Sequence, residues 1–135
     1  MFTDGEIAYL ASQRIGRLAT AQPDGTLQNS PVGYAYHRDL NCIDIGGRDM
    51  AASRKFRNVA ANGRVAFVVD DLASVSPWVP RCLEIRGRGE AIEQPTDSAS
   101  RIPGPIIRIH PERIISWGID PPESALGTRN VSGES

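Results

Sequence analysis

The 135-residue sequence contains few of the side chains that build metal sites or nucleophilic centres. Its two cysteines, Cys42 and Cys82, are too few for a disulfide framework, and we expect both to be small buried thiols. Its two histidines, His37 and His110, lie far apart, and none of these four residues has metal-ligand spacing. A zinc site or a Cys–His nucleophile pair is therefore not expected. This scarcity indicates that any chemistry belongs to a bound cofactor.

The sequence also lacks a long hydrophobic run. No apolar segment approaches the roughly 18 residues that a membrane-spanning helix needs, so no membrane partner is expected. The first six residues lack the basic and then apolar segments of a signal peptide, which predicts a soluble, cytoplasmic protein. A formal net charge of −1 excludes a uniformly basic surface, so no nucleic-acid partner is expected.

Local sequence patterns predict a mainly β protein with two short helices. A capping box of Thr3 and Glu6 predicts a helix that ends near Gln13, and a second helix is expected over residues 50–61 with Asp49 as its candidate N-cap. Strands are expected at residues 15–21, 27–37, 42–46, 64–70, 81–93 and 106–109, with a further one at 113–119. About six strands joined mostly by short turns favour a closed antiparallel barrel over a parallel doubly wound sheet.

The first candidate site lies around the start of the second expected helix. Lysine is nearly absent from the chain, and the single one, Lys55, falls beside Arg48, Arg54 and Arg57. Cations near the positive end of a helix, together with Ser53 and Asn58, form a plausible phosphate or carboxylate cradle. An ordinary solvated basic helix face explains the same pattern equally well.

Two further candidates come from polar and aromatic residues. Thr20 and the segment 29–33 place hydroxyl and amide groups on two paired strands beside Pro31, where free backbone groups could bind a planar heterocycle. A bulged strand whose polar residues face solvent is the simpler alternative. Trp78 and Trp117 are candidates to cap a ligand ring, although packing on a core edge or a dimer partner is more common.

Several motifs, in their order and spacing, resemble those of one protein family. They are Ile15-Gly16-Arg17-Leu18-Ala19-Thr20, Pro23-Asp24-Gly25, Ser30-Pro31-Val32-Gly33-Tyr34, Ser53-Arg54-Lys55-Phe56-Arg57-Asn58-Val59, Val65-Ala66-Phe67-Val68-Val69-Asp70-Asp71, Glu84-Ile85-Arg86-Gly87-Arg88-Gly89-Glu90-Ala91 and Ile114-Ile115-Ser116-Trp117-Gly118. Together they resemble the pyridoxamine 5'-phosphate oxidase-like split β-barrel superfamily. The later motifs resemble its branch of deazaflavin (coenzyme F-420)-dependent oxidoreductases. The resemblance implies a six-stranded antiparallel split β-barrel of the FMN-binding type over residues 1–120, and residues 121–135 are expected to form an extended or flexible tail.

The resemblance further implies a homodimer with two cofactor sites at the subunit interface. In it, residues 17–20 and 29–32 line the isoalloxazine-like ring, the segment around Lys55 meets the phosphate end, and three residues close the pocket, in part from the second subunit. The candidate cofactor-binding residues are Arg17, Leu18, Ala19, Thr20, Asn29, Ser30, Pro31, Val32, Arg48, Ser53, Arg54, Lys55, Arg57, Asn58, Trp78, Arg81 and Trp117.

The function that the resemblance implies is that of an oxidoreductase that uses reduced coenzyme F-420 to transfer hydride to a small unsaturated organic substrate. An FMN-dependent oxidoreductase of the same fold and a non-catalytic flavin- or deazaflavin-binding protein are the alternatives. FMN ends in one phosphate, whereas coenzyme F-420 continues into a polyglutamate tail, so Arg48, Arg54 and Arg57 favour the deazaflavin. The chain is much shorter than true pyridoxamine phosphate oxidases and lacks their C-terminal region, so vitamin B6 chemistry is not expected.

Overall fold

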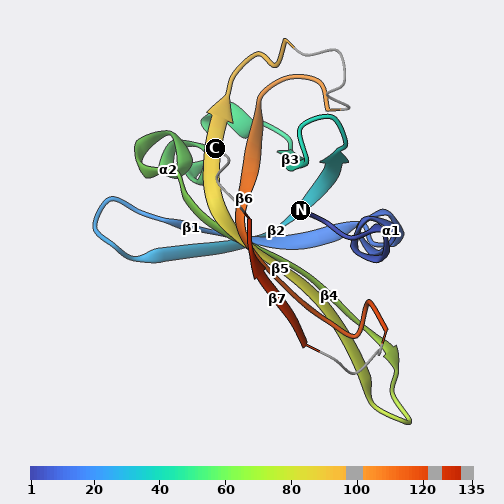
Figure 1. Ribbon diagram of the computed structural model, residues 1–135. Coiled ribbons are helices and arrows are strands. Elements are labelled where there is room, and N and C mark those ends of the chain that lie inside the picture. Colours follow the sequence, from blue (N-terminus) through green and yellow to red (C-terminus); the bar gives the residue numbers. More distant parts are fainter. Residues whose placement is uncertain (97–101, 122–125, 132–135) are drawn as a thin grey trace.

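The computed structural model describes residues 1–96, 102–121 and 126–131. Within these residues the chain forms two α-helices, a 3-10 turn and seven strands (Figure 1). In chain order the elements are α1 (Asp4–Ser12), β1 (Ile15–Ala21), β2 (Leu27–His37), β3 (Cys42–Gly46), η1 (Met50–Ala52), α2 (Arg54–Asn62), β4 (Arg64–Ser74), β5 (Val79–Ile92), β6 (Ile106–Trp117) and β7 (Leu126–Asn130).

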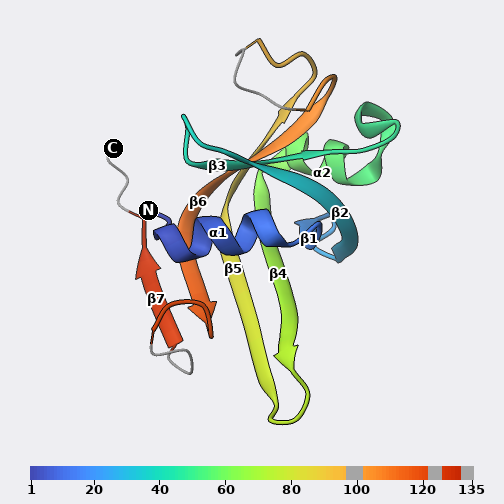
Figure 2. The same ribbon diagram turned by 90° about the vertical axis from the view of Figure 1, so that its right-hand side faces the viewer.

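Six of the strands close into an antiparallel barrel. The strand order is β3-β2-β1-β4-β5-β6, and β3 also pairs with β6, which closes the ring. β7 lies outside the ring and pairs with β6 (Figures 1 and 2). The expected fold, a mainly β protein built on a six-stranded antiparallel barrel, is confirmed.

The barrel is split because β2 changes partners along its length. Residues 27–33 pair with β1, whereas residues 33–37 pair with β3. In the described part of the chain, residues 27–32 therefore have a strand on one side only. Pro31 lies in this edge stretch, a setting in which a strand tolerates the missing N–H of proline. We refer to residues 27–32 as the open edge of β2.

Two expected elements differ from those observed. The strands expected at 106–109 and 113–119 form one strand, β6, because a bulge opposite Arg86 and Gly87 lets the ladder continue. A Cβ at position 87 would collide with the carbonyl of His110, so only glycine permits this approach. The second helix begins at Arg54 with Ser53 as its N-cap. Asp49 does not cap it, because its backbone is left-handed (φ 53°) instead of extended.

Aliphatic and aromatic side chains from all six barrel strands fill the interior. α1 adds Tyr9 and Leu10 to this core, and α2 adds Phe56 and Val59. Full burial of one such side chain stabilises the fold by about 1.5–3 kcal/mol. The core therefore fixes both helices against the barrel, although they cover different parts of it (Figures 1 and 2).

A buried ion pair lies where β3 and β6 close the barrel. Asp44 and Arg108 are register partners, and Nε and Nη2 of Arg108 donate to Oδ1 and Oδ2 of Asp44 at 2.7 and 3.0 Å. Both side chains are more than nine-tenths buried. Removal of one member of such a pair leaves an uncompensated charge in the interior.

The C-terminal segment is partly ordered as a strand. Residues 126–130, which were expected in an extended or flexible tail, form β7, which pairs with β6 from Arg113 to Trp117. Residues 122–125 and 132–135 of that expected tail lie outside the described residues. No helix in the described ranges combines the length and the apolar character needed to cross a bilayer.

Candidate functional site

The start of α2 is positively charged and has no acidic neighbour in its first turn. Ser53 fixes this start, since its Oγ accepts a hydrogen bond from the Phe56 amide at 3.2 Å and donates to the Met50 carbonyl at 2.7 Å. Lys55 is partly exposed and has no hydrogen-bond or ion-pair partner among the described residues. Its ammonium adds to the positive end of the helix dipole, which together favour an anion here.

Within the described residues, the two arginines of α2 bond to neutral groups. Arg54 donates to Oε1 of Gln22 at 3.2 Å, and Arg57 donates to the carbonyl of Ala52, also at 3.2 Å. Arg48, in the turn before η1, is exposed. Because no carboxylate neutralises Arg54 or Arg57 in the described part of the chain, their charge is available to a ligand.

Asn58 connects α2 to the first two strands on the inner face of the barrel. Its Nδ2 donates to Oγ1 of Thr20 at 3.1 Å and to Oε1 of Gln28 at 3.2 Å. Asn58 and Thr20 are each only 2% exposed. These two predicted site residues are thus brought together, and the bond from Asn58 to Gln28 ties α2 to the open edge of β2.

Ser30, on that open edge, contains an unpaired polar atom. Its Oγ is buried and has no hydrogen-bond partner within the described ranges. A buried hydroxyl without a partner costs about 1–3 kcal/mol relative to a bonded one. The neighbouring predicted residues Leu18 and Val32 are core residues, 1% and 6% exposed, so a ligand can reach them only through their backbone.

The outer face of the sheet contains a shallow depression of about 260 Å³. It is lined by Arg17, Ala19, Asn29, Ala66, Phe67, Val68 and Glu84. Its floor is small and apolar at Ala19 and Ala66, which face each other in the β1–β4 register. Arg17 pairs with Asp70 at 2.5 Å at the rim. A planar group could lie flat on this floor while the rim offers both signs of charge.

A third polar group lies at the base of the long β4–β5 hairpin. Arg81 binds Asp71 through Nε at 3.0 Å and Nη2 at 2.6 Å, and the Tyr9 hydroxyl donates to Asp71 at 2.8 Å. The hydrogen bond from Arg81 holds the pKa of Asp71 below its ordinary value. Burial, together with Asp71, raises the pKa of Tyr9. Arg81 is therefore already neutralised by its own chain.

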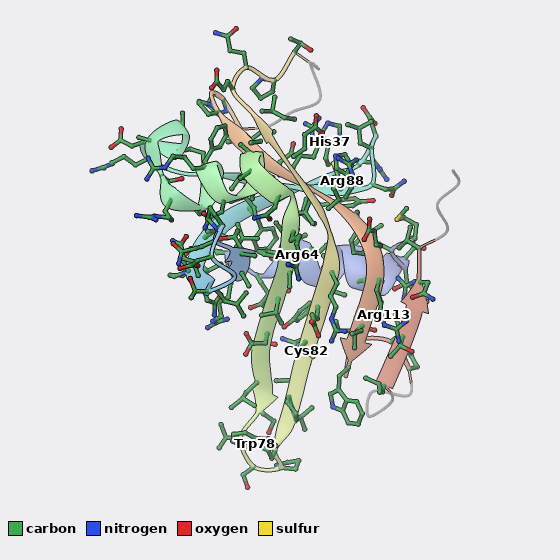
Figure 3. The ribbon with its side chains drawn as sticks, turned by 90° about the vertical axis from the view of Figure 1, so that its left-hand side faces the viewer. His37, Arg64, Trp78, Cys82, Arg88 and Arg113 are labelled. Atoms are coloured by element: carbon green, nitrogen blue, oxygen red, sulfur yellow. The ribbon has the colours of Figure 1, made fainter. Side chains whose placement is uncertain are left out.

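The two tryptophans lie away from α2. Trp78 is near the tip of the β4–β5 hairpin, at the opposite end of the molecule from α2 (Figure 3), and is 67% exposed. Trp117 is opposite Cys82 at the same end of the sheet. Within one chain the structure does not bring Trp78, Arg81 or Trp117 to the residues of α2.

The predicted ring-lining residues divide between the two faces of the sheet. Side chains alternate along a strand, so Arg17, Ala19, Asn29 and Pro31 share the outer face, while Leu18, Thr20, Ser30 and Val32 share the inner one. Sequence reasoning missed two residues. Gln28 lies two positions before Ser30 and therefore shares its inner face, and Asp71 lies opposite Arg81 in the β4–β5 hairpin. Both follow from strand alternation and hairpin symmetry.

Comparison with known families agrees with this geometry. The model of the pyridoxamine 5'-phosphate oxidase family matches residues 4–118, which is most of the chain. The chain belongs to the pyridoxamine 5'-phosphate oxidase family. The superfamily resemblance that the motifs indicated is thereby confirmed.

This family member is similar to several known proteins. It is 48% identical over 122 residues to a 5a,11a-dehydrotetracycline/5a,11a-dehydrooxytetracycline reductase of Streptomyces rimosus, covering 88% of this chain and 84% of the relative. Its fold is similar to that of a conserved hypothetical protein from Mycobacterium tuberculosis (TM-score 0.69, 24% identity, 99% and 94% coverage). It is also similar in fold to an FAD-binding protein from Mycobacterium smegmatis (TM-score 0.62, 18% identity, 85% and 93% coverage).

Proposed function

We propose that this protein is an oxidoreductase that uses reduced coenzyme F-420 to reduce an unsaturated organic substrate. The observation that carries the proposal is the uncompensated positive charge at the start of α2, a helix that Asn58 ties to Gln28 on the open edge of β2. The 48% identity to a reductase supports the class of reaction. Both observations favour a redox cofactor with an anionic tail over a metal-dependent or nucleophilic reaction.

The residues present fit a planar ring joined to an anionic tail. The buried Ser30 hydroxyl without a partner offers a hydrogen bond to a ring heteroatom, and it lies on the same inner face as Thr20, which Asn58 of α2 contacts. Lys55 and Arg57 would hold the phosphate, which accepts charge-assisted hydrogen bonds. Arg48 and Arg54 would contact the acidic tail that continues beyond it.

The roles of the side chains follow from this arrangement. When bound, the reduced deazaflavin supplies a hydride, and the reduced carbon–carbon double bond takes its proton from another source. Thr20 is a poor source, because it is 2% exposed and already hydrogen-bonded by Asn58. We assign this proton to solvent, and we assign Thr20 and Asn58 to positioning α2 against the cofactor.

The substrate class follows from the reductase relative. That relative acts on dehydrotetracyclines, so we propose a conjugated polycyclic or similarly unsaturated substrate for this chain. Such a substrate contains a conjugated ring system, and conjugated rings stack well on aromatic side chains.

We further propose a homodimer in which each copy completes the site of the other. Leu72, Val75 and Trp78 expose 42%, 69% and 67% of their surface on the β4–β5 hairpin, which projects beyond the barrel (Figure 2). Exposed apolar clusters of this kind mark interaction surfaces. Trp78 and Trp117 can then contact a cofactor at α2 only across the dimer. Light scattering should give a mass near twice 14.6 kDa for the wild type and a lower average mass for Trp78→Ala.

Titration and turnover together test the function. Coenzyme F-420 should bind more tightly than FMN, and the reduced form should be oxidised on addition of a dehydrotetracycline. The similarity in fold to an FAD-binding protein favours an FMN-dependent oxidoreductase as the second candidate. Tighter binding of FMN would establish that candidate, and binding of either cofactor without turnover of any enone substrate would indicate a non-catalytic carrier.

A further inference from the structure

Glu6 of α1 is the most deeply buried acidic residue of the helix and has several partners. Its carboxylate accepts a hydrogen bond from the Thr3 amide at 3.0 Å and so completes the capping box of α1. The side chain is 0% exposed. Burial alone raises the pKa of this carboxyl, but Arg129, the Thr3 amide and Ser116 together hold it below its ordinary value.

The main charge partner of Glu6 comes from the C-terminal strand. Arg129 of β7 forms a bidentate contact with the Glu6 carboxylate, through Nη2 to Oε1 and through Nη1 to Oε2 at 3.1 Å. Its Nε also donates to the carbonyl of Met1 at 2.9 Å. One side chain of β7 therefore binds both Met1, two residues before the cap, and Glu6 in the first turn of α1, 123 positions away in sequence.

β7 is itself a short element held at one edge. Its five residues pair with β6 and with no second strand in the described ranges. This helix start is also supported by the hydrogen bond from Thr3 Oγ1 to Asp120 Oδ2 at 2.8 Å and by Phe2, whose ring packs edge-to-face on Tyr36. The second half of α1 is anchored differently, through Tyr9 and Leu10 in the core.

The first turn of α1 also forms part of the walls of two cavities. Ile7 lines a cavity of about 470 Å³ between α1 and β2, with Tyr34 and Tyr36 opposite. Gly5 and Ala8 line a second cavity of about 330 Å³, next to Arg81. Both volumes fall at or above the lower limit for small-molecule sites, so movement of this turn would change the access of a small organic molecule.

We propose that β7 is a latch: Arg129 holds the first turn of α1 closed over these two cavities, and loss of the Arg129–Glu6 contact releases that turn while the core-anchored half of the helix stays in place. Hydrogen bonds between charged groups are among the stronger non-covalent contacts, and this one joins two short elements from opposite ends of the chain. The latch is independent of the cofactor assignment, because Arg129 touches neither α2 nor the open edge of β2.

Amide hydrogen exchange on the full chain tests the latch at individual residues. Arg129→Gln should speed exchange at Ile7 and Ala8 by about tenfold or more, while Ile43 in the core keeps its protection. Glu6→Gln should give the same increase, because glutamine retains the capping hydrogen bond but loses the charge. The double variant should exchange at Ile7 and Ala8 little faster than either single variant, because both substitutions remove the same contact. The apolar anion 8-anilinonaphthalene-1-sulfonate should bind more tightly to all three variants than to the wild type.

Arg113→Gln provides the matched control. Arg113 bonds to Asn130 at 2.7 Å and so also ties β6 to β7, but it does not reach α1. Exchange at Ile7 should stay at the wild-type rate in this variant. Unchanged exchange at Ile7 and Ala8 in both Arg129→Gln and Glu6→Gln would overturn the latch, as would an equal rise at Ile43, which would mean global destabilisation.

Discussion

Arginine side chains differ in burial and in charge pairing between two regions of this barrel. At the β3–β6 closure, Arg108 is buried and its guanidinium is met by both oxygens of Asp44. At the start of α2, Arg54 and Arg57 are exposed. Among the described residues they bond to an amide and a carbonyl, and Lys55 bonds to none. The same side-chain chemistry is thus neutralised by the chain in one place and left uncompensated in the other.

The difference separates charges that hold the fold from charges that are available to a ligand. A buried guanidinium must be paired, because the cost of an isolated charge in the interior exceeds the net stability of most domains. An exposed cation carries no such cost and contributes little to folding, so its placement is explained by what it binds. Cations at a helix start with no acid in the first turn therefore indicate an anion site.

The largest effect should follow from disrupting the barrel closure. Arg108→Ala leaves Asp44 buried without its partner and should lower the free energy of unfolding by about 3–5 kcal/mol. Arg86→Ala is the control, because its pair with Glu84 is more than half exposed on the arginine side and should be worth at most about 1 kcal/mol. Urea unfolding of both variants measures the contrast. Equal losses of unfolding free energy in the two variants would show that burial does not decide how much an arginine ion pair stabilises this fold.

The next effect should be on binding and not on stability. Lys55→Ala and Arg57→Ala should each weaken cofactor binding by about 1–3 kcal/mol, because each removes a charge-assisted hydrogen bond to the phosphate. Their urea midpoints should match the wild type. Arg64→Ala, an exposed arginine just beyond the other end of α2, is the control and should bind as the wild type does. Unaltered affinity in both site variants at low salt would remove α2 from the site.

The hairpin pair of Asp71 and Arg81 is an intermediate case, since it is paired but partly exposed. The hydrogen bond from Arg81 lowers the pKa of Asp71 in the folded state, so the carboxylate stabilises the fold above its unfolded pKa of about 3.9. That stabilisation is lost as the pH falls through the lower folded-state pKa. Asp71→Asn should therefore be less stable than the wild type at pH 7, and the gap should narrow in acid. A gap that is constant from pH 7 to pH 3 would contradict this assignment.

Much of the fold could be predicted from local sequence patterns. β1, β2 and β3 occur at their expected residues, because Pro23-Asp24-Gly25 and the turn before Cys42 separate alternating runs. β6 was expected as two strands, because only the tertiary approach at Gly87 shows that the ladder continues past Pro111. Ser53 could have been identified as the cap of α2 by its position before Arg54, but the left-handed backbone of Asp49 could not.

The candidate site was less predictable, because it depends on pairing between distant elements. The alternation of β1 and β2 implies that the predicted ring-lining residues cannot all face one ligand, but the partner of each face is visible only in three dimensions. The contact between Thr20 and Asn58 spans 38 positions. The ion pair of Glu6 with Arg129 joins the two ends of the chain, so no local pattern indicated it.

The smallest expected effect concerns the choice of cofactor. Arg48 and Arg54 are exposed, so contacts that they make with an acidic tail are screened by salt over about 8–10 Å, and each should be worth about 0.2–1 kcal/mol. The preference for coenzyme F-420 over FMN should therefore shrink as salt is added, and in Arg48→Gln or Arg54→Gln it should shrink at low salt. FMN affinity should change little in these variants, because FMN has no tail. Fluorescence titrations of both cofactors at low and high ionic strength measure the difference. A preference for coenzyme F-420 that survives high salt would assign it to the buried ring contacts, and the exposed arginines of α2 would then serve the phosphate alone.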